Sequence, residues 1–305
     1  MQVNEQQINL ALTELVQCTT PLDHDVDLAQ FLRGKRVVVV GPAQTLLGTR
    51  SGARIDAYDV VIRFNNAIHF MPFSAQLGAD IGVRTDILYC NHQVIYDILA
   101  QQGMVAALKL LAQRARSVVA PLFRSTRRSS AMHPQGISRA QFATRCQAAG
   151  IKYLICTNNN LSYQRNGAPT PRCAAPSRTS MLEFERFLSN QGVAAKFRVL
   201  YATTALFNQW INGCVGRTGA IAILDLLLHD IEQLYVTGMT FYHQGGHLFQ
   251  PGLGELHPLL GPDGLILSGL ERHNSYLELE VMKLLATHLQ HKLQVDDPLS
   301  TLLAE

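Results

Sequence analysis

The chain has 305 residues, 47% of them apolar, with a formal net charge of +3 and a sequence pI of about 8.5. This composition is sufficient for a sizeable folded core and excludes an intrinsically disordered chain. The small positive excess suits an anionic ligand but lacks the clustered charge of a nucleic-acid-binding protein, so no nucleic acid partner is expected.

The N-terminal residues predict a short amphipathic helix rather than a membrane segment. Apolar side chains such as Ile8 and Leu15 fall roughly on one face, and we expect residues 1–30 to form a helical flank before the first strand. Acidic residues from Glu5 to Asp25 interrupt every apolar run, so neither a signal peptide nor a spanning segment of about 20 apolar residues is expected. The scattered cysteines contain no CxxC pair, which favours a reduced, cytoplasmic setting.

Short apolar runs bounded by Gly, Asn or Asp alternate with helical patterns along the chain. The runs that predict strands cover residues 37–40, 60–62, 86–90, 117–120, 153–156, 198–201 and 233–238. Such runs are typical of buried parallel strands. The sequence therefore predicts an α/β fold, a Rossmann-like, open, mostly parallel sheet flanked by helices, in a single domain spanning residues 1–305.

Residues 122–146 interrupt this alternation with a stretch rich in Arg, Ser, Gln and Gly. The interpretation is a mobile basic insertion within the domain. A solvated loop explains the composition, and a flexible lid or a contact with an anionic membrane surface is the alternative. The arginines of this stretch are Arg124, Arg127, Arg128, Arg139 and Arg145.

Polar groups follow the second predicted strand, at the sheet edge where α/β folds bind ligands. The amides of Asn65 and Asn66 can bind a ribose hydroxyl, a phosphate oxygen or a base edge, and capping of a turn explains them equally well. Arg63 can bind an anion, or it can tie to a carboxylate such as Asp56 or Asp59. We therefore predict that this edge of the sheet forms half of a binding crevice.

Three further features have both a functional and a structural explanation. Gly41 closes the first run without G-x-G-x-x-G or a Walker lysine, so dinucleotide and P-loop recognition are unsupported and a tight turn explains the glycine. Thr218 and Gly219 begin an apolar helix, whose free N–H groups and dipole form a natural phosphate or carboxylate site. His273 precedes Glu278 by five residues; a histidine with a pKa of about 6.5 can act as a general base, and a surface histidine fits as well.

The order of these stretches resembles glycosyltransferase family 29, the sialyltransferases. Residues 37–86 resemble the long sialyl motif, and residues 218–238 resemble the short motif. His273 to Glu278 is similar to the very short motif, H-x-x-x-x-E, in the expected place near the C-terminus. The resemblance implies the sialyltransferase-type variant of the GT-A fold in a bacterial-type, cytoplasmic enzyme that can contact the inner membrane surface peripherally.

This resemblance implies an inverting transfer of sialic acid or Kdo from its CMP conjugate to a hydroxyl of a cell-surface glycan, which can be lipid-linked. It implies neither a metal nor a separate cofactor. His273 would take the acceptor proton, and Glu278 would be the second catalytic residue. The donor-binding positions are Gly41, Ala43, Arg63, Asn65, Asn66, Asn91, Arg217, Thr218, Gly219, Tyr242 and His243.

Some positions depart from the family pattern. Pro42 stands where the family usually has asparagine, which removes a side-chain contact to the nucleotide, and Arg217 replaces a small hydroxyl residue and can supply charge for the donor carboxylate. The histidine of the third motif is His243, His247 or His257. Two other classes remain open: a non-catalytic nucleotide- or glycan-binding α/β protein, and another nucleotide-dependent α/β enzyme such as a methyltransferase.

Overall fold

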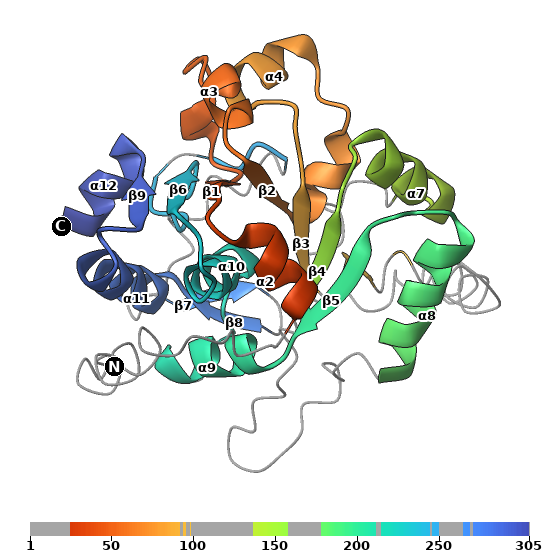
Figure 1. The fold of residues 1–305 in the computed structure, drawn as a ribbon. Helices are drawn as coiled ribbons and strands as arrows, with labels where there is room; N and C mark the ends of the chain where they lie inside the picture. Colours follow the sequence, from red (N-terminus) through yellow and green to blue (C-terminus); the bar gives the residue numbers. More distant parts are fainter. Residues whose placement is uncertain are drawn as a thin grey trace, which may run out of the picture.

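The structure is a computed structural model that describes residues 25–91, 94–95, 98, 137–157, 178–211, 215–244, 246–249, 265–268 and 271–304. The strands within these residues are β1 (Arg36–Val40), β2 (Val60–Phe64), β3 (Ile87–Asn91), β4 (Tyr153–Thr157), β5 (Lys196–Leu200), β6 (Gln233–Thr237), β7 (Leu265–Ser268), β8 (Glu271–Asn274) and β9 (Leu293–Val295). Seven of them form one sheet in the order β5-β4-β3-β2-β1-β6-β9 (Figure 1). Every neighbouring pair in this sheet is parallel, whereas β7 and β8 form an antiparallel pair.

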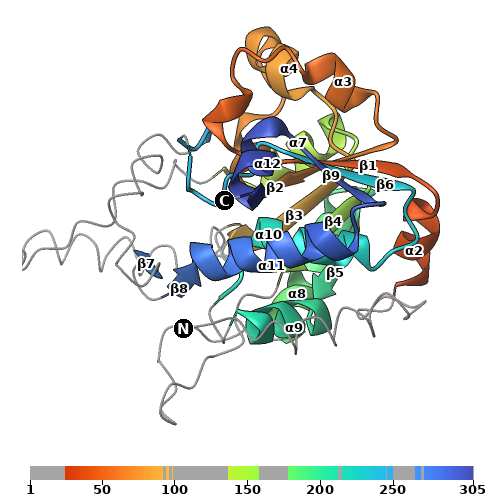
Figure 2. The same cartoon turned by 90° about the vertical axis from the view of Figure 1, so that its left-hand side faces the viewer.

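Helices cover both faces of the sheet, so the predicted α/β fold is confirmed. The helices that pack on one face are α2 (Val26–Leu32), α9 (Ala202–Trp210), α10 (Thr218–Leu227), α11 (Ser275–His288) and α12 (Asp297–Ala304). Those on the other are α3 (Gly52–Asp56), α4 (Ala75–Ile81), α7 (Arg139–Ala148) and α8 (Arg178–Asn190), with the short 3₁₀ helices η1 (Gln44–Leu46) and η2 (Asn65–Phe70). In Figure 2, α3 and α4 lie on one side of the strands and α10 and α11 on the other.

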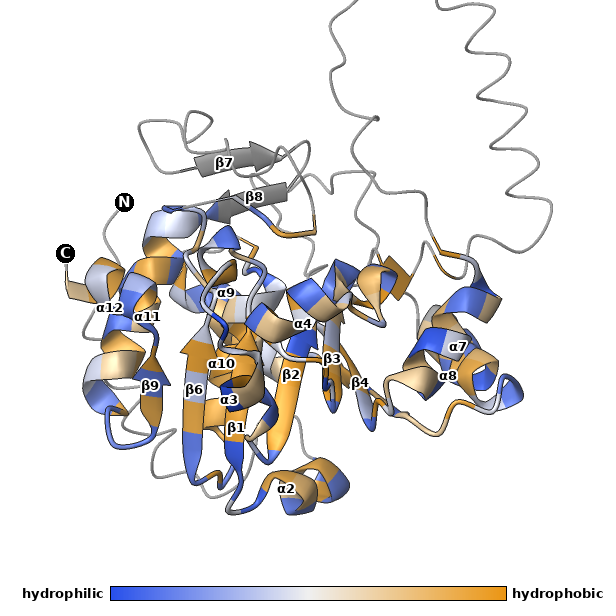
Figure 3. Cartoon of the chain, turned by 90° about the horizontal axis from the view of Figure 1, so that it is seen from above, coloured by the Kyte–Doolittle hydropathy of each residue, from blue (hydrophilic) through white to orange (hydrophobic). Residues whose placement is uncertain are grey.

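The two-residue repeat of a strand sends alternate side chains into two separate cores. Val37 and Val39 of β1 pack in the core with α10, whereas Val38 and Val40 pack in the core with α3 and α4. Because both faces are covered, the strands read as unbroken apolar runs rather than as alternating patterns. The strands of the sheet are accordingly coloured mainly as apolar in Figure 3.

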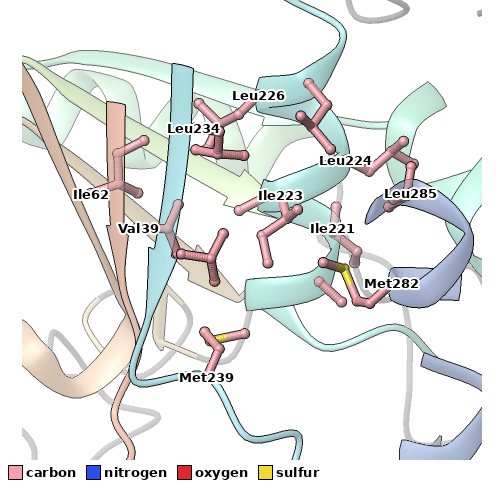
Figure 4. Close-up of a cluster of buried hydrophobic side chains, with 14 of the residues drawn as sticks. Val39, Ile62, Ile221, Ile223, Leu224, Leu226, Leu234, Met239, Met282 and Leu285 are labelled. Atoms are coloured by element: carbon pink, nitrogen blue, oxygen red, sulfur yellow. The ribbon is translucent and has the colours of Figure 1, made fainter. Parts of the chain in front are cut away.

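Helix α10 is buried along its whole length. Ile221, Ile223 and Leu224 pack between the sheet and α11, as Figure 4 shows with Leu234 of β6 and Met282 of α11. A helix that is apolar on all sides requires such a central position, and each fully buried aliphatic side chain stabilises the fold by about 1.5–3 kcal/mol. The sheet and α11 therefore hold the start of α10 in a defined place.

The predicted basic insertion, residues 122–146, is contradicted at its C-terminal end. Ser138 and Gln141 form a reciprocal capping box that begins α7. Arg145 donates to the carbonyl oxygen of Ile68 at 3.1 Å, so its charge serves a structural contact rather than a mobile surface. The polar, arginine-rich composition of this stretch favoured the prediction of a loop, although its S-x-x-Q capping pattern is a local signal for a helix start.

Other predicted segments are only partly described. Helix α2 begins at Val26, inside the predicted flank of residues 1–30. Of the predicted helix over residues 94–111, Val94, Ile95 and Ile98 are helical and buried. The predicted strand over residues 117–120 lies outside the described residues. Within the described part of the chain, every helix is too short or too polar to cross a bilayer.

Candidate functional site

The strand order reverses between β1 and β6, and a ligand crevice is expected at the carboxyl ends of strands at such a point. Gly41 follows β1 and Gly238 follows β6. A Cβ atom at Gly41 would lie 2.1 Å from the carbonyl oxygen of Gly238, so a side chain there would clash with backbone. Close approach of the two strand ends therefore requires Gly41, which supports the structural explanation for this glycine.

The loops that follow β1 and β6 are joined to each other. The carbonyl oxygen of Pro42 accepts a hydrogen bond from the backbone N–H of Leu248 at 2.6 Å, and Ala43 forms an isolated antiparallel bridge with His247. Ala43 is buried in this pairing. Pro42 has neither an N–H nor a side-chain amide, and its carbonyl is already bonded. The position after Gly41 thus stabilises the loop pair in this chain.

Polar groups from three strand ends and one helix start meet at the carboxyl edge of the sheet. Asn65 Oδ1 accepts from the N–H of Asn91 at 2.7 Å, and Asn65 Nδ2 donates to Thr218 Oγ1 at 3.4 Å. Thr157 Oγ1 lies 3.4 Å from the same hydroxyl. The structure therefore brings together three predicted donor-binding residues that are far apart in the sequence. We call Asn65, Asn91, Thr157 and Thr218 the strand-end cluster.

Backbone geometry distinguishes one member of the strand-end cluster. Asn65 has a φ of 41°, in the left-handed region that asparagine tolerates better than most residues. Such conformations are concentrated at functional sites. Asn66 follows it and is half-buried in η2. The Asn65 amide bonds to Asn91 and Thr218 across the strand ends, and η2 begins without a side-chain cap, so the arrangement of Asn65 favours the predicted ligand edge over the capping of a turn.

Thr157 follows the predicted strand of residues 153–156 at the expected ligand edge, but it was not among the predicted donor-binding residues. It is fully buried at the end of β4, and its hydroxyl also lies 3.5 Å from the carbonyl oxygen of Cys90. Threonine is a common strand former, so within an apolar run it gives little sign of a site. Its position directly after the predicted strand of residues 153–156, at the edge shared with Asn65, was the available signal.

Helix α10 begins at the strand-end cluster with no side-chain cap. The first N–H groups of a helix lack intrahelical acceptors, and the helix dipole places partial positive charge there. This end of α10 therefore favours an oxyanion. A Cβ atom at Gly219 would lie 2.5 Å from Met239 Cε, the flexible end of a side chain that would have to shift to make room for it.

Arg217 and Glu278 form an ion pair between the N-cap of α10 and the first turn of α11. The Glu278 carboxylate, 0% exposed, accepts from the backbone N–H of Arg217 at 2.7 Å and from Arg217 Nη1. Arg217 Nη2 is buried without a hydrogen-bond partner, and its guanidinium lies 4.8 Å from the ring centre of Tyr242. Glu278 is therefore an anchor for Arg217 rather than a carboxylate that faces a substrate, contrary to its predicted catalytic role.

Arg63 does not join the predicted donor site. It is 1% exposed, and its Nη2 donates to the carbonyl oxygens of Ile81 at 2.6 Å and Gly82 at 3.1 Å. Burial lowers the pKa of Arg63 to about 10, although the negative charge of Asp56 opposes this shift. The predicted anion contact is therefore corrected: Arg63 binds the backbone at the end of α4, and its ties are to carbonyls rather than to a carboxylate.

The predicted donor residues Tyr242 and His243 lie half-buried in the loop after β6. Phe241 and Tyr242 have left-handed φ values of 50° and 65°, which cost on the order of 1–3 kcal/mol each. Burial raises the pKa of Tyr242. The ring of His243 meets the ring of Tyr276 edge-on at 5.0 Å. This loop thus carries strained backbone next to Arg217.

His247 lies in the same loop, where its Nδ1 accepts from the N–H of Phe249 at 3.1 Å. This bond favours the tautomer with hydrogen on Nε2. Burial lowers the pKa of His247 to about 4, so the imidazole is neutral near pH 7. His257 lies outside the described residues, and the histidine of the third motif remains a prediction among these positions.

His273 lies in β8, where it is paired with Ile266 of β7. The next residue, Asn274, caps α11 by accepting the N–H of Leu277 at 3.0 Å. The H-x-x-x-x-E spacing therefore corresponds to a strand, an N-cap and the first helical turn that holds Glu278. The His273 side chain lies outside the described part, so its role as a base stays a prediction.

No group of three or more His, Cys, Asp or Glu side chains that could hold a metal ion occurs among the described residues. That the chain needs no metal therefore stays a prediction, which activity with and without a chelator tests.

Comparisons with known proteins show the following. The sequence model of glycosyltransferase family 29 (sialyltransferase) matches residues 1–127. A sialyltransferase-like protein 2 from Oryza sativa subsp. indica is 37% identical over 83 residues, which cover 27% of this chain and 20% of that protein. The chain therefore matches only a fifth of the length of this curated relative.

Among solved structures, a mammalian sialyltransferase in complex with Gal-beta-1-3GalNAc-ortho-nitrophenol aligns with a TM-score of 0.42 at 15% identity, covering 95% of this chain and 79% of that one. The α-2,3-sialyltransferase Cst-I from Campylobacter jejuni aligns with a TM-score of 0.46 at 13% identity, covering 87% and 77%. At these TM-scores and identities, the two alignments are reported as similarities and carry no conclusion about the activity of this chain. The sequence of residues 1–127 is thus similar to glycosyltransferase family 29 (sialyltransferase), which agrees with the predicted resemblance over that part of the chain.

Proposed function

We propose that this chain is an inverting glycosyltransferase that moves an acidic keto-sugar, sialic acid or Kdo, from its CMP conjugate to a hydroxyl of a cell-surface glycan. The observation that carries the proposal is the strand-end cluster, which places Asn65, Asn91 and Thr218 together at the start of α10. The family match of residues 1–127 supports the same assignment, because these residues supply Asn65 and Asn91.

The donor would lie along the carboxyl edge of the sheet. Asn65 and Asn66 provide amides for the ribose or phosphate of CMP. The start of α10 would stabilise negative charge that develops on the departing phosphate, since its N–H groups are already oriented. Arg217 Nη2, which lacks a partner, would bind the carboxylate of the sugar. Tyr242 and His243 complete the proposed donor contacts.

The acceptor hydroxyl would attack the anomeric carbon while the bond from that carbon to the CMP phosphate oxygen breaks. His273 would take the hydroxyl proton, and CMP would leave with the bonding electrons. A neutral imidazole with a pKa of about 6.5 is suited to this step near pH 7. The attack inverts the anomeric centre, and the proposal needs no metal.

The test is product analysis with CMP-sialic acid and CMP-Kdo against capsular, lipooligosaccharide and lipopolysaccharide acceptors, with and without a chelator. A glycosylated product formed with either donor, at the same rate with chelator present, is expected. His273→Ala should abolish transfer and leave CMP affinity nearly unchanged, because the base acts on the acceptor. The matched control is His291→Ala, which removes an exposed histidine after α11. Equal loss of transfer and CMP affinity in His273→Ala would contradict its assignment as the base.

The two alternative classes predict different outcomes. A non-catalytic nucleotide- or glycan-binding protein would bind CMP or glycan without forming product. A methyltransferase or dehydrogenase would be stabilised by S-adenosylmethionine or NAD rather than by CMP. A lipid-linked acceptor at the cytoplasmic membrane face belongs to the proposal, and greater activity on acceptor presented in anionic vesicles than on free acceptor would support it.

A further inference from the structure

A buried hydrogen bond joins the middle of the sheet to the C-terminal half of α10. The hydroxyl of Tyr89, on β3, donates to Asp225 Oδ2 at 2.7 Å. Tyr89 is 0% exposed and Asp225 is 1% exposed. Both belong to the part of the molecule where apolar side chains fill the space between α10 and the strands, and the rings of Tyr89 and Phe64 are 6.3 Å apart.

A carboxylate in this place is costly for the fold. Removing a carboxylate from water costs several kcal/mol unless its oxygens are well bonded. Burial and the neighbouring charge of Asp225 also raise the pKa of Tyr89 well above its usual value, so the phenol remains a donor. An apolar pair would fill the same volume at lower cost. The position of the Tyr89–Asp225 pair relative to the strand-end cluster offers a reason why polar side chains occupy this place.

Side chains of α10 make hydrogen bonds at two levels along the helix axis, at Thr218 and at Asp225, and both residues lie on one face of the helix. Asp225 follows Thr218 by seven residues, which is two helical turns and about 10.5 Å along the axis. Tyr89 precedes Asn91 by two residues, so their side chains lie on the same face of β3. The upper level is the strand-end cluster, where Asn65 links the N–H of Asn91 to Thr218. The lower level is the bond from Tyr89 to Asp225.

We infer that Tyr89 and Asp225 are positioning residues for the proposed donor site: their directional bond fixes the rotation and height of α10, and thereby the place of Thr218. Apolar packing holds α10 between the sheet and α11, and the hydrogen bond adds a directional constraint on the helix; a rotation by one residue would turn a side chain by about 100°. A hydrogen bond weakens steeply when its angle and distance change. The inference rests on the proposed function, because its readout is CMP binding.

The experiment compares unfolding midpoints, CMP affinity by calorimetry and the KM for the CMP-sugar in four variants. Asp225→Asn keeps an oxygen acceptor for Tyr89 and should retain CMP affinity within about twofold. Tyr89→Phe should weaken CMP binding on the order of tenfold, with kcat at saturating donor less affected. The double variant Tyr89→Phe with Asp225→Leu removes both polar groups. It should recover a midpoint at or above that of Tyr89→Phe while CMP affinity remains about tenfold low.

The matched control is Tyr153→Phe, which removes the hydroxyl of a buried tyrosine of β4 on the same core face. It should leave CMP affinity unchanged. Wild-type CMP affinity in a stable double variant would overturn the inference and leave the pair a purely structural contact. If the double variant does not fold, an unchanged donor KM in Tyr89→Phe overturns it equally. Absence of CMP binding by the wild-type chain would instead remove the proposed function, and the inference with it.

Discussion

Arg217 and Glu278 form a buried ion pair that joins the segment resembling the short sialyl motif to the segment resembling the very short motif. Glu278 therefore connects the α11 turn that follows His273 to the start of α10. The family resemblance alone assigns Glu278 a catalytic role, whereas its contacts make it a structural link between the two predicted halves of the site.

Neutralising Glu278 should destabilise the fold. Glu278→Gln leaves the guanidinium of Arg217 without a counter-charge, and breaking a buried pair in this way costs about 3–5 kcal/mol. The free energy of unfolding from urea titration measures the loss. The control is Glu280→Gln in the same helix, whose carboxylate is 47% exposed and pairs with Lys283 at 3.0 Å. Equal effects of the two variants would contradict a buried, stabilising pair.

Arg217→Lys should reduce selectivity for an acidic donor. Lysine retains a positive charge for Glu278, but it lacks a second nitrogen that could bind the donor carboxylate while the first binds Glu278. We expect kcat/KM for the CMP-sugar acid to fall about tenfold or more, with little change for its methyl ester. Competition kinetics with the two donors gives the ratio. Arg36→Lys, on the opposite edge of the sheet, is the control; an unchanged acid-to-ester ratio in Arg217→Lys argues against the proposed contact.

Stability should decline below neutral pH through His229. Burial and the charge of Lys292 lower the pKa of His229 to about 4, against about 6.5 in the unfolded chain. Between these values the unfolded chain binds a proton that the folded chain does not, so this stability is present above about pH 6.5 and is lost as pH falls toward about 4. Urea titrations from pH 4.5 to 7 should show a shallower pH slope for His229→Leu. His291→Leu, at an exposed position, should keep the wild-type slope.

The buried thiols should be inert in the folded protein. Cys90, Cys146 and Cys156 are free and buried, and burial raises the pKa of Cys146 and Cys156 to about 12 and that of Cys90 well above its usual value. Since the thiolate is the reactive form, these groups should react with a disulfide reagent only after unfolding. A variant with serine at positions 18, 173 and 214 isolates them. Rapid labelling of the native variant would contradict their burial.

The main strands could be predicted from sequence because burial on both faces makes them continuous apolar runs. Val37–Val40 is an example. The edge strand β9 was missed, because Leu293–Val295 is short and its middle residue is exposed. Helix α7 was hidden by its arginines, although its capping box was present in the sequence. Local patterns therefore identified the centre of the sheet better than its periphery.

The site could be predicted only where polarity changes abruptly along the chain. Asn65 and Thr218 stand at such boundaries, yet their contact joins segments that sequence periodicity does not relate. Arg63 stands at a similar boundary, but its guanidinium turns to the carbonyls at the end of α4. Thr157 ends β4, and because threonine is a common strand former its residue type alone does not indicate a site. Side-chain direction and tertiary pairing, which decide these cases, depend on the assembled sheet.

The most direct test of the CMP-sugar assignment is the unfolding midpoint of the wild-type chain with CMP, compared with equal concentrations of NAD and S-adenosylmethionine. A ligand at one hundred times its Kd stabilises the folded state by about 2.7 kcal/mol. The strand-end cluster and the start of α10 predict a midpoint that rises with CMP concentration and stays unchanged with the other two ligands. An unchanged midpoint at saturating CMP would contradict the assignment.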